Sequence, residues 1–206
     1  MTSPTPLRLL IADDADLVAE ALQALLQTYD EFEVVARVNR GDLVLDAVRE
    51  YRPDVALLDV DMPGATGIEA AAEVVAEFPD CRVLLLTALE GSGHLHRALS
   101  AGGSGYILKS TTADRLVEAI RTVAAGGTVV DPALAAVALR LGPSPLSDRE
   151  AEILRLAGTG QDTATVAAQL FLSRGTVRNY LSRAIMKLDA ANRAEAYAKA
   201  ERHGWL

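Results

Sequence analysis

The sequence predicts an α/β domain built on a doubly wound, five-stranded parallel sheet, followed by a small all-α domain of four helices. Short apolar runs alternate with helix-period stretches up to residue 125, and from residue 146 onward only helix-period stretches occur. The charge divides in the same way. Residues 1–145 carry 11 basic and 21 acidic side chains, whereas residues 146–206 carry 9 basic and 7 acidic ones. An acidic first part and a slightly basic second part indicate two domains with different partners.

The composition restricts the class of protein. Half of the 206 residues are hydrophobic, which is enough to bury the core of one large domain or two small ones. The single cysteine, Cys81, excludes an internal disulfide and a cysteine-based zinc site. No run of about 18 apolar residues is present, and the first six residues lack the pattern of a secretion signal. We therefore expect a soluble, cytoplasmic protein with no membrane partner.

The domain boundary is expected at the stretch Gly142-Pro143-Ser144-Pro145, because neither a helix nor a strand would run through it. This gives a first domain over 1–125, a linker over 126–145 and a second domain over 146–206.

Four short apolar runs in the first domain are typical of strands buried on both faces, and they lie at 7–12, 55–58, 83–86 and 105–108. A fifth candidate strand with a weaker pattern lies at 32–37. The helix-period stretches between and after them lie at 17–26, 43–50, 68–77, 95–100 and 113–125. Five repeats of a strand followed by a helix predict a parallel sheet with helices on both faces.

Polar side chains follow four of these strands at the point where each strand ends. They are Asp13, Asp14, Asp59, Thr87 and Lys109. The carboxyl ends of parallel strands meet at one edge of a sheet, so these side chains should converge. Crowded carboxylates repel one another unless a cation lies among them, and oxygen ligands favour Mg²⁺. Taken singly, the aspartates could be helix caps and the lysine a solvated turn residue. Together they predict a magnesium site that accepts a phosphoryl group.

Residues 7–125 resemble the receiver domain of two-component response regulators, which has a flavodoxin/CheY-like fold. The stretches that carry the resemblance are Ile11-Ala12-Asp13-Asp14, Leu57-Leu58-Asp59-Val60-Asp61-Met62-Pro63-Gly64, Leu86-Thr87-Ala88 and Gly105-Tyr106-Ile107-Leu108-Lys109-Ser110.

The resemblance implies a role for each residue of this set. Asp59 would be the phosphoacceptor and a metal ligand, and a histidine kinase would supply the phosphoryl group. The other implied Mg²⁺ contacts are Asp14 directly, Asp13 through water and Asp61 through its backbone carbonyl. Thr87 and Lys109 would contact the phosphoryl group, and Tyr106 would be the aromatic switch residue.

The sequence of the second domain predicts four helices, and residues typical of a helix N-terminus precede three of them. Ser147 and Glu150 fit a capping box, and Asp162 and Ser173 stand at cap positions. The expected helices lie at 149–157, 163–170, 174–188 and 193–202. The second and third, joined by a tight turn, predict a helix-turn-helix.

The third helix carries only positive charge. Its charged residues are Arg174, Arg178, Arg183 and Lys187. Its buried face is expected at Val177, Leu181, Ile185 and Leu188. Arginine and asparagine can read guanine and adenine edges, so Arg178 and Asn179 favour double-stranded DNA as the partner. An ordinary amphipathic helix with a solvated basic face is the alternative.

Residues 146–206 resemble the LuxR-type helix-turn-helix domain of the NarL/FixJ class. The matching stretches are Leu146-Ser147-Asp148-Arg149-Glu150, Leu170-Phe171-Leu172-Ser173-Arg174-Gly175-Thr176-Val177-Arg178-Asn179-Tyr180 and Lys187-Leu188. By this resemblance Arg178, Asn179 and Ser182 fall at base-reading positions. Thr176, Arg183 and Lys187 fall at phosphate positions. The family's usual phosphate-contacting lysine is Ala164 here, so the monomer should bind modestly and depend more on dimerisation.

The main hypothesis is a transcription regulator that is not an enzyme: phosphorylation of Asp59 promotes a homodimer and sequence-specific DNA binding. The apolar residues Leu116, Ile120 and Val123 are either a dimer surface or part of the core. Two other hypotheses stay open. A phosphatase of the haloacid-dehalogenase type would use Asp61 as its second acid but leaves residues 146–206 unexplained. A DNA-binding protein that uses its receiver only to dimerise would not need the complete acidic site.

Overall fold

The computed structural model describes residues 5–88, 92–141 and 144–206. The chain divides into two compact units, and the division falls inside a helix, after Ala135. In the described part of the chain, no helix is both long enough and apolar enough to cross a membrane.

The first unit is a parallel sheet with the strand order β2-β1-β3-β4-β5-β6. Its strands are β1 (Leu7–Ala12), β2 (Phe32–Val38), β3 (Val55–Asp59), β4 (Arg82–Thr87), β5 (Gly105–Leu108) and β6 (Val129–Val130). Its helices are α1 (Asp16–Leu26), α2 (Val44–Tyr51), α3 (Gly67–Glu77), α4 (Ser92–Ser100) and α5 (Ala113–Ala124), and the short 3-10 helix η1 (Gly41–Leu43) precedes α2. All five predicted strands and all five predicted helices are present.

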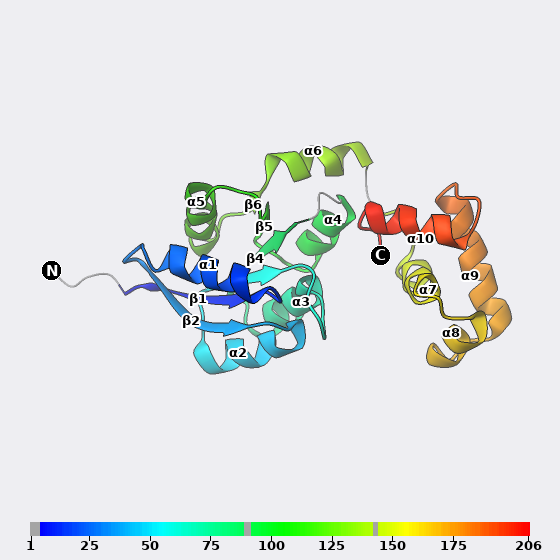
Figure 1. The fold of residues 1–206 in the computed structure, drawn as a ribbon, viewed down its shortest axis with the longest axis horizontal. Coiled ribbons are helices and arrows are strands. Elements are labelled where there is room, and N and C mark those ends of the chain that lie inside the picture. The colour runs from blue at the N-terminus through cyan, green and yellow to red at the C-terminus, as the bar shows by residue number, and fades with distance from the viewer. Residues whose placement is uncertain (1–4, 89–91, 142–143) are drawn as a thin grey trace. The chain divides into compact units, whose positions relative to one another are not determined.

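Helices cover both faces of this sheet, as Figure 1 shows. Alternate residues of the strands point to opposite faces, and both faces are apolar. On one face, Leu9, Ile11 and Leu57 pack in a cluster with residues of α1 and α5. The intervening residues, such as Leu10 and Leu58, are also fully buried. Burial on both faces explains why β1, β3, β4 and β5 are nearly continuous apolar runs, whereas the edge strand β2 is mostly half-buried and carries the exposed Glu33 and Arg37.

The sixth strand is a correction to the predicted five-stranded sheet. The stretch 126–145, expected as a linker, contains β6 and the helix α6 (Pro132–Leu141). The backbone N–H of Val129 donates to Ser104 at 3.1 Å, and that of Asp131 donates to Tyr106 at 2.9 Å. A strand of two residues is too short to show an alternating pattern, so the sequence did not reveal it. The limits 1–125, 126–145 and 146–206 stay a prediction.

The apolar face of α5 belongs to the core. Leu116 is 4% exposed, and Ile120 and Val123 are fully buried. All three pack in the cluster that joins α1 and α5 to the sheet. Of the two alternatives for these residues, the structure therefore shows the core and not an exposed dimer strip.

The second unit contains the four expected helices. They are α7 (Asp148–Gly158), α8 (Thr163–Gln169), α9 (Arg174–Lys187) and α10 (Arg193–Arg202). The caps expected at Ser147, Asp162 and Ser173 are confirmed, since each side chain accepts from a backbone N–H in the first turn. Between α8 and α9, Phe171 turns the chain with a left-handed φ of 54°. One hydrophobic core joins α7, α8, α9 and α10.

Candidate phosphoacceptor site and nucleic-acid interface

Three carboxylates meet where β1 and β3 end. One oxygen each from Asp13, Asp14 and Asp59 lies within 4.8 Å of the other two. The backbone N–H of Asp13 donates to Val38, and the amide after Asp59 donates to Leu86, so neighbouring strands fix both strand ends. Asp13 and Asp59 are buried, with 1% and 4% of their surface exposed, whereas Asp14 is exposed. The sheet edge therefore gathers the acids that the sequence predicted to converge.

Lys109 places its ammonium among these acids. Its Nζ lies 2.7 Å from Oδ2 of Asp13 and 3.1 Å from Oδ2 of Asp59. The Lys109 backbone N–H donates to Thr87 at 2.7 Å, which ties the end of β5 to the end of β4. One cation thus bridges two buried carboxylates, while the exposed carboxylate of Asp14 lies at the rim.

The pKa values of the central pair are both raised, for different reasons. Burial raises the pKa of Asp59 above its ordinary value, and it outweighs the opposing effects of Lys109 and the Asp61 backbone N–H. Burial alone would lower the pKa of Lys109, but its hydrogen bonds and ion pairs with Asp13 and Asp59 outweigh burial and raise it. Lys109 is therefore held in its charged form, and the Asp59 carboxylate is poorly solvated and close to a cation.

The loop after Asp59 is shaped by a close backbone contact that the sequence analysis missed. A Cβ on Gly67 would lie 2.0 Å from the Asp59 backbone oxygen, so only glycine fits there. Thr66 and Glu69 form a capping box that starts α3 at this glycine. The spacing of Thr66 and Glu69 is the signal that would have located this helix start.

Thr87 lies on β4, the neighbour of β3, and Tyr106 lies on β5, the next strand of the sheet. Thr87 is fully buried at the end of β4, one residue beyond Leu86, which pairs with Asp59. Tyr106 is fully buried on β5, where burial raises its pKa to about 12 while the side chain of Thr87 acts in the opposite direction. The structure thus places the predicted switch tyrosine in an inward position, beside the predicted hydroxyl.

The donor set at this edge fits a hard divalent cation. Three carboxylate oxygens are the ligands that Mg²⁺ prefers, and Mg²⁺ in proteins usually keeps several waters besides one or two carboxylates. Asp61 lies on the exposed side of the site, and its backbone N–H donates to the Asp59 carboxylate. The predicted role of the Asp61 backbone carbonyl as a metal ligand stays a prediction.

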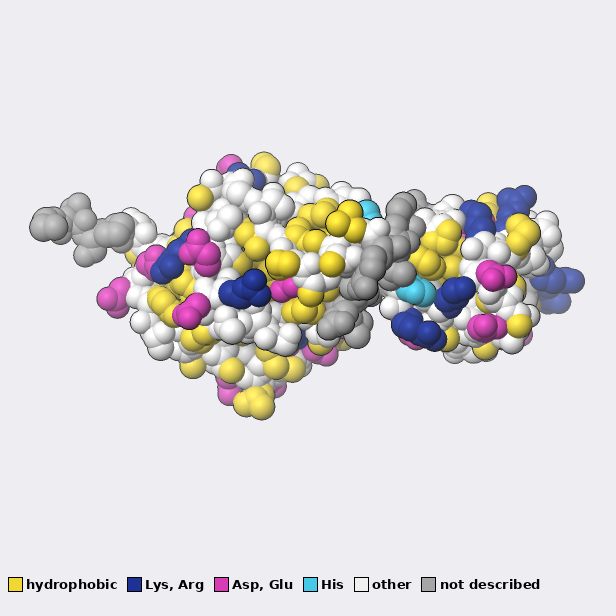
Figure 2. Space-filling view, turned by 90° about the horizontal axis from the view of Figure 1, so that it is seen from above, with side chains coloured by type: hydrophobic (Ala, Val, Ile, Leu, Met, Phe, Trp, Pro, Cys, Tyr) yellow, Lys and Arg dark blue, Asp and Glu magenta, His cyan; other side chains and the backbone are white. Residues whose placement is uncertain are grey.

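The predicted DNA-contacting residues lie on the outer side of α9. Arg178, Asn179, Ser182 and Arg183 are exposed, and Thr176 is half-buried. The opposite side, formed by Val177, Leu181, Ala184 and Leu188, is buried in the core. Figure 2 shows Lys and Arg side chains gathered over the C-terminal unit. The helix therefore presents a polar and basic face that carries no acid.

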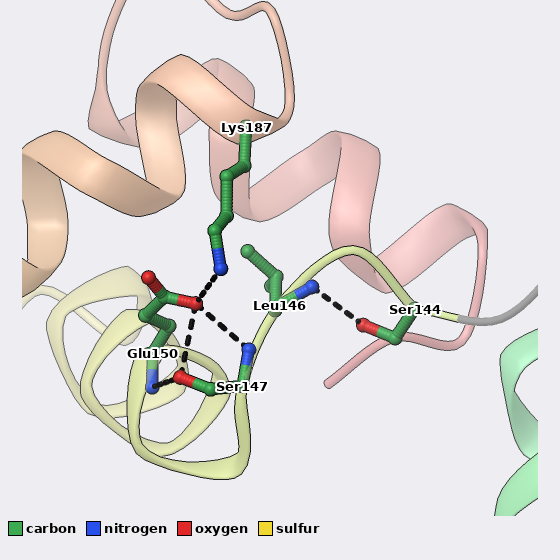
Figure 3. Close-up of polar contacts among 5 residues, drawn as sticks. All are labelled: Ser144, Leu146, Ser147, Glu150 and Lys187. Atoms are coloured by element: carbon green, nitrogen blue, oxygen red, sulfur yellow. Dashed lines mark hydrogen bonds and ion pairs between the residues drawn. The ribbon is translucent and has the colours of Figure 1, made fainter.

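Lys187 has a partner inside the unit that the sequence did not suggest. Its Nζ donates to Oε2 of Glu150 at 2.6 Å, and the same oxygen accepts from the backbone N–H and hydroxyl of Ser147 at 2.7 and 2.9 Å (Figure 3). The Glu150 side chain is only 4% exposed, whereas that of Lys187 is 38% exposed. The capping box of α7 thus also anchors the last turn of α9. A contact from Lys187 to a phosphate would have to use its remaining N–H groups.

Comparisons with known proteins agree with both halves of this description. Residues 9–121 match the family described as response regulator receiver domain, and residues 144–200 match the bacterial regulatory proteins of the luxR family. The transcriptional regulatory protein DesR of Bacillus subtilis is 38% identical over 95% of this chain and 97% of its own. The probable transcriptional regulatory protein NarL of Mycobacterium tuberculosis is 34% identical over the full length of both.

Solved structures extend the likeness to the fold. The response regulator ChrA of a heme-sensing two-component system is 29% identical, with 98% of this chain and all of that chain covered and a TM-score of 0.59. These matches exclude the phosphatase hypothesis, because regulators with this pair of domains are transcription factors and not enzymes. The chain therefore belongs to the two-component response regulators, with a receiver domain followed by a LuxR-type DNA-binding domain that regulates transcription.

Proposed function

We propose that Asp59 is the phosphoacceptor of this response regulator. The observation that carries the proposal is the position of its carboxylate, which is buried at a strand end 3.1 Å from the Lys109 ammonium and beside Asp13 and Asp14. An Asp59 oxygen attacks the phosphorus of a phosphohistidine on a partner kinase. A P–O bond forms, the P–N bond breaks, and the bonding pair stays with the imidazole nitrogen.

The residues around Asp59 then stabilise the added charge. The phosphoryl group brings about −1.5 to −2 charge, and Lys109 is placed to pair with its oxygens. Asp13, Asp14, Asp59 and the backbone carbonyl of Asp61 would hold Mg²⁺, which supplies further positive charge to the phosphoryl oxygens. Thr87 donates its hydroxyl to the phosphoryl group, and the inward position of Tyr106 is favoured with it.

The output is sequence-specific binding of double-stranded DNA through α9. Arg178, Asn179 and Ser182 read base edges in the major groove, and Thr176, Arg183 and Lys187 contact phosphates. The exposure of these side chains on one acid-free helix supports the assignment, although Lys187 also bonds to Glu150. We place this activity in the cytoplasm, where the chain meets its kinase and its DNA.

Phosphorylation promotes a homodimer in this proposal. One helix-turn-helix covers about one half-site, and a two-fold dimer matches two half-sites about one helical turn apart. Because Leu116, Ile120 and Val123 are buried, the apolar face of α5 is not the contact, and we assign no receiver surface to the dimer. Sedimentation with and without beryllofluoride checks the dimer, since an activated protein that stays monomeric contradicts it.

Phosphate-affinity electrophoresis tests the phosphoacceptor. Wild type treated with acetyl phosphate and Mg²⁺ should give one retarded band, and Asp59→Asn should give none. The exposed Asp61→Asn is the matched control and should still shift, because it removes a nearby carboxyl without removing the nucleophile. A band that survives Asp59→Asn contradicts the assignment. If the wild-type protein gives no retarded band, the result supports the alternative that the receiver only dimerises.

A further inference from the structure

The DNA-facing side of α9 carries one large apolar residue that the proposed contacts do not use. Met186 is 73% exposed, although the last two turns of α9 pack against the core on their other side. Within residues 144–206, the only other large hydrophobic residue with high exposure in the described structure is Phe171, in the turn before α9. Met186 therefore stands alone as an apolar side chain on the outer face of this helix.

Helix geometry puts Met186 on the same line as Asn179. An α-helix turns 100° per residue, so residues seven apart differ by only about 20° around the axis. The buried residues Val177, Leu181 and Leu188 lie on the side opposite that line. Met186 thus lies near the middle of the outer face, one turn beyond Ser182, and about 10 Å along the axis from Asn179.

The charge of this face indicates which kind of partner it binds. The helix contains three arginines and a lysine and no acid, so a polyanion is favoured over an apolar protein partner. In the major groove of DNA the one apolar group on a base edge is the thymine methyl. Methionine is long, unbranched and flexible, so at the C-terminal end of α9 it suits a contact with a methyl group on the floor of the groove.

We propose that Met186 is a specificity-determining residue that contacts a thymine methyl, about two to three base pairs along the groove from the pair that Asn179 reads. The distance of about 10 Å would span about three base pairs along the duplex axis, where the rise is about 3.4 Å per base pair, and it spans fewer along the groove because the groove is inclined to that axis. The proposal rests on the proposed role of α9 as the recognition helix. It adds one T·A pair to each half-site that hydrogen bonding alone would not select.

Replacing thymine by uracil tests the contact, because it removes only the methyl group. DNA selected from a random pool by the beryllofluoride-activated full-length protein provides the site, and each thymine is then replaced singly by deoxyuridine. Wild type should lose about fourfold in affinity at one position per half-site, the factor expected for burying one methyl group. Met186→Ala should bind thymine and uracil equally at that position and keep the uracil effects at others.

Met186→Leu is the matched control, since it keeps an apolar side chain at the same place and should retain most of the preference for thymine. The proposal is overturned if no thymine position loses its methyl dependence in Met186→Ala. It is also overturned if Met186→Ala changes transcription in a purified system without changing DNA binding, which would indicate a protein partner. Failure to select any DNA at all would instead contradict the proposed role of α9, so the two failures are distinguishable.

Discussion

Breaking the ion pair between Lys187 and Glu150 should destabilise the C-terminal unit. Lys187→Met keeps the length and apolar stem of the side chain and removes the ammonium that lies 2.6 Å from the buried Glu150 carboxylate. That carboxylate keeps its two bonds from Ser147, so one of three donors is lost. The variant therefore tests how much of the anchoring of α9 depends on this one contact.

The size of the effect follows from the burial of the two groups. Removing one partner of a fully buried ion pair costs about 3–5 kcal/mol, whereas an exposed pair contributes about 0–1 kcal/mol. Here Glu150 is buried while Lys187 is 38% exposed, and two donors remain. We therefore expect an intermediate loss of about 1.5–2.5 kcal/mol. With a urea slope of about 1 kcal/mol/M for so small a unit, the midpoint falls by about 1.5–2.5 M.

Urea unfolding of the full-length protein measures this loss locally. Trp205, the single tryptophan of the chain, packs against the core of the C-terminal unit and reports its unfolding by fluorescence. Arg183→Met is the matched control, because it removes a cation from the same helix that is paired with no acid among the described residues. It should change the midpoint by much less.

The dependence on pH follows from the lowered pKa of Glu150. Burial by itself would raise that pKa, but the hydrogen bonds from Lys187 and Ser147 outweigh it. A carboxyl whose folded pKa is lowered contributes stability above its ordinary pKa of about 4.3, and loses it as the pH falls through the folded value. The gap between wild type and Lys187→Met should therefore shrink from pH 7 towards pH 3. A gap independent of pH, or a loss equal to that of Arg183→Met, would refute the reasoning.

Three further changes have directions that the structure sets. Mg²⁺ at ten times its dissociation constant should stabilise the wild-type receiver by about 1.4 kcal/mol, and Asp14→Asn should lose most of that gain in a thermal melt because one of three carboxylates is gone. Phe171→Asn should stabilise the second unit by about 1 kcal/mol in urea unfolding, since Phe171 is 96% exposed and holds a left-handed φ that asparagine tolerates better. Arg178→Ala should reduce discrimination among DNA sequences by about 1–3 kcal/mol. Arg183→Ala should weaken binding to all sequences alike and lower the slope of log affinity against log salt concentration by about one. Equal behaviour of the two variants in competition assays would contradict the assigned roles.

The sequence predicted most of the fold because the local signals agree with the tertiary structure. Most of the apolar runs became strands because they are buried on both faces, whereas the edge strand β2 is mostly half-buried. Ser147, Asp162 and Ser173 cap the expected helices. The convergence of Asp13 and Asp59 on Lys109 followed from the rule that parallel strands end at one edge. These features depend on residues near in sequence or on topology alone.

What the sequence did not predict depends on contacts between distant residues. Glu150 meets Lys187 across 37 positions, and a lysine near a helix end looks the same whether or not it has a partner. On α9 the pattern favoured Ile185 as buried, but Ala184 is fully buried and Ile185 only partly, so the outer face centres nearer to Met186 than expected. Apolar residues on α5 fitted a dimer surface and a core equally, and only packing decides between them.

The most direct test of the central claim is the affinity for DNA with Asp59 activated and not activated. Fluorescence anisotropy with a labelled site selected from random DNA gives the dissociation constant of the full-length protein with and without beryllofluoride and Mg²⁺. Wild type should bind at least tenfold more tightly when activated, and Asp59→Asn should bind equally weakly under both conditions. A wild type whose affinity does not change, or an Asp59→Asn variant that responds as wild type does, would contradict the claim that phosphorylation of Asp59 controls DNA binding.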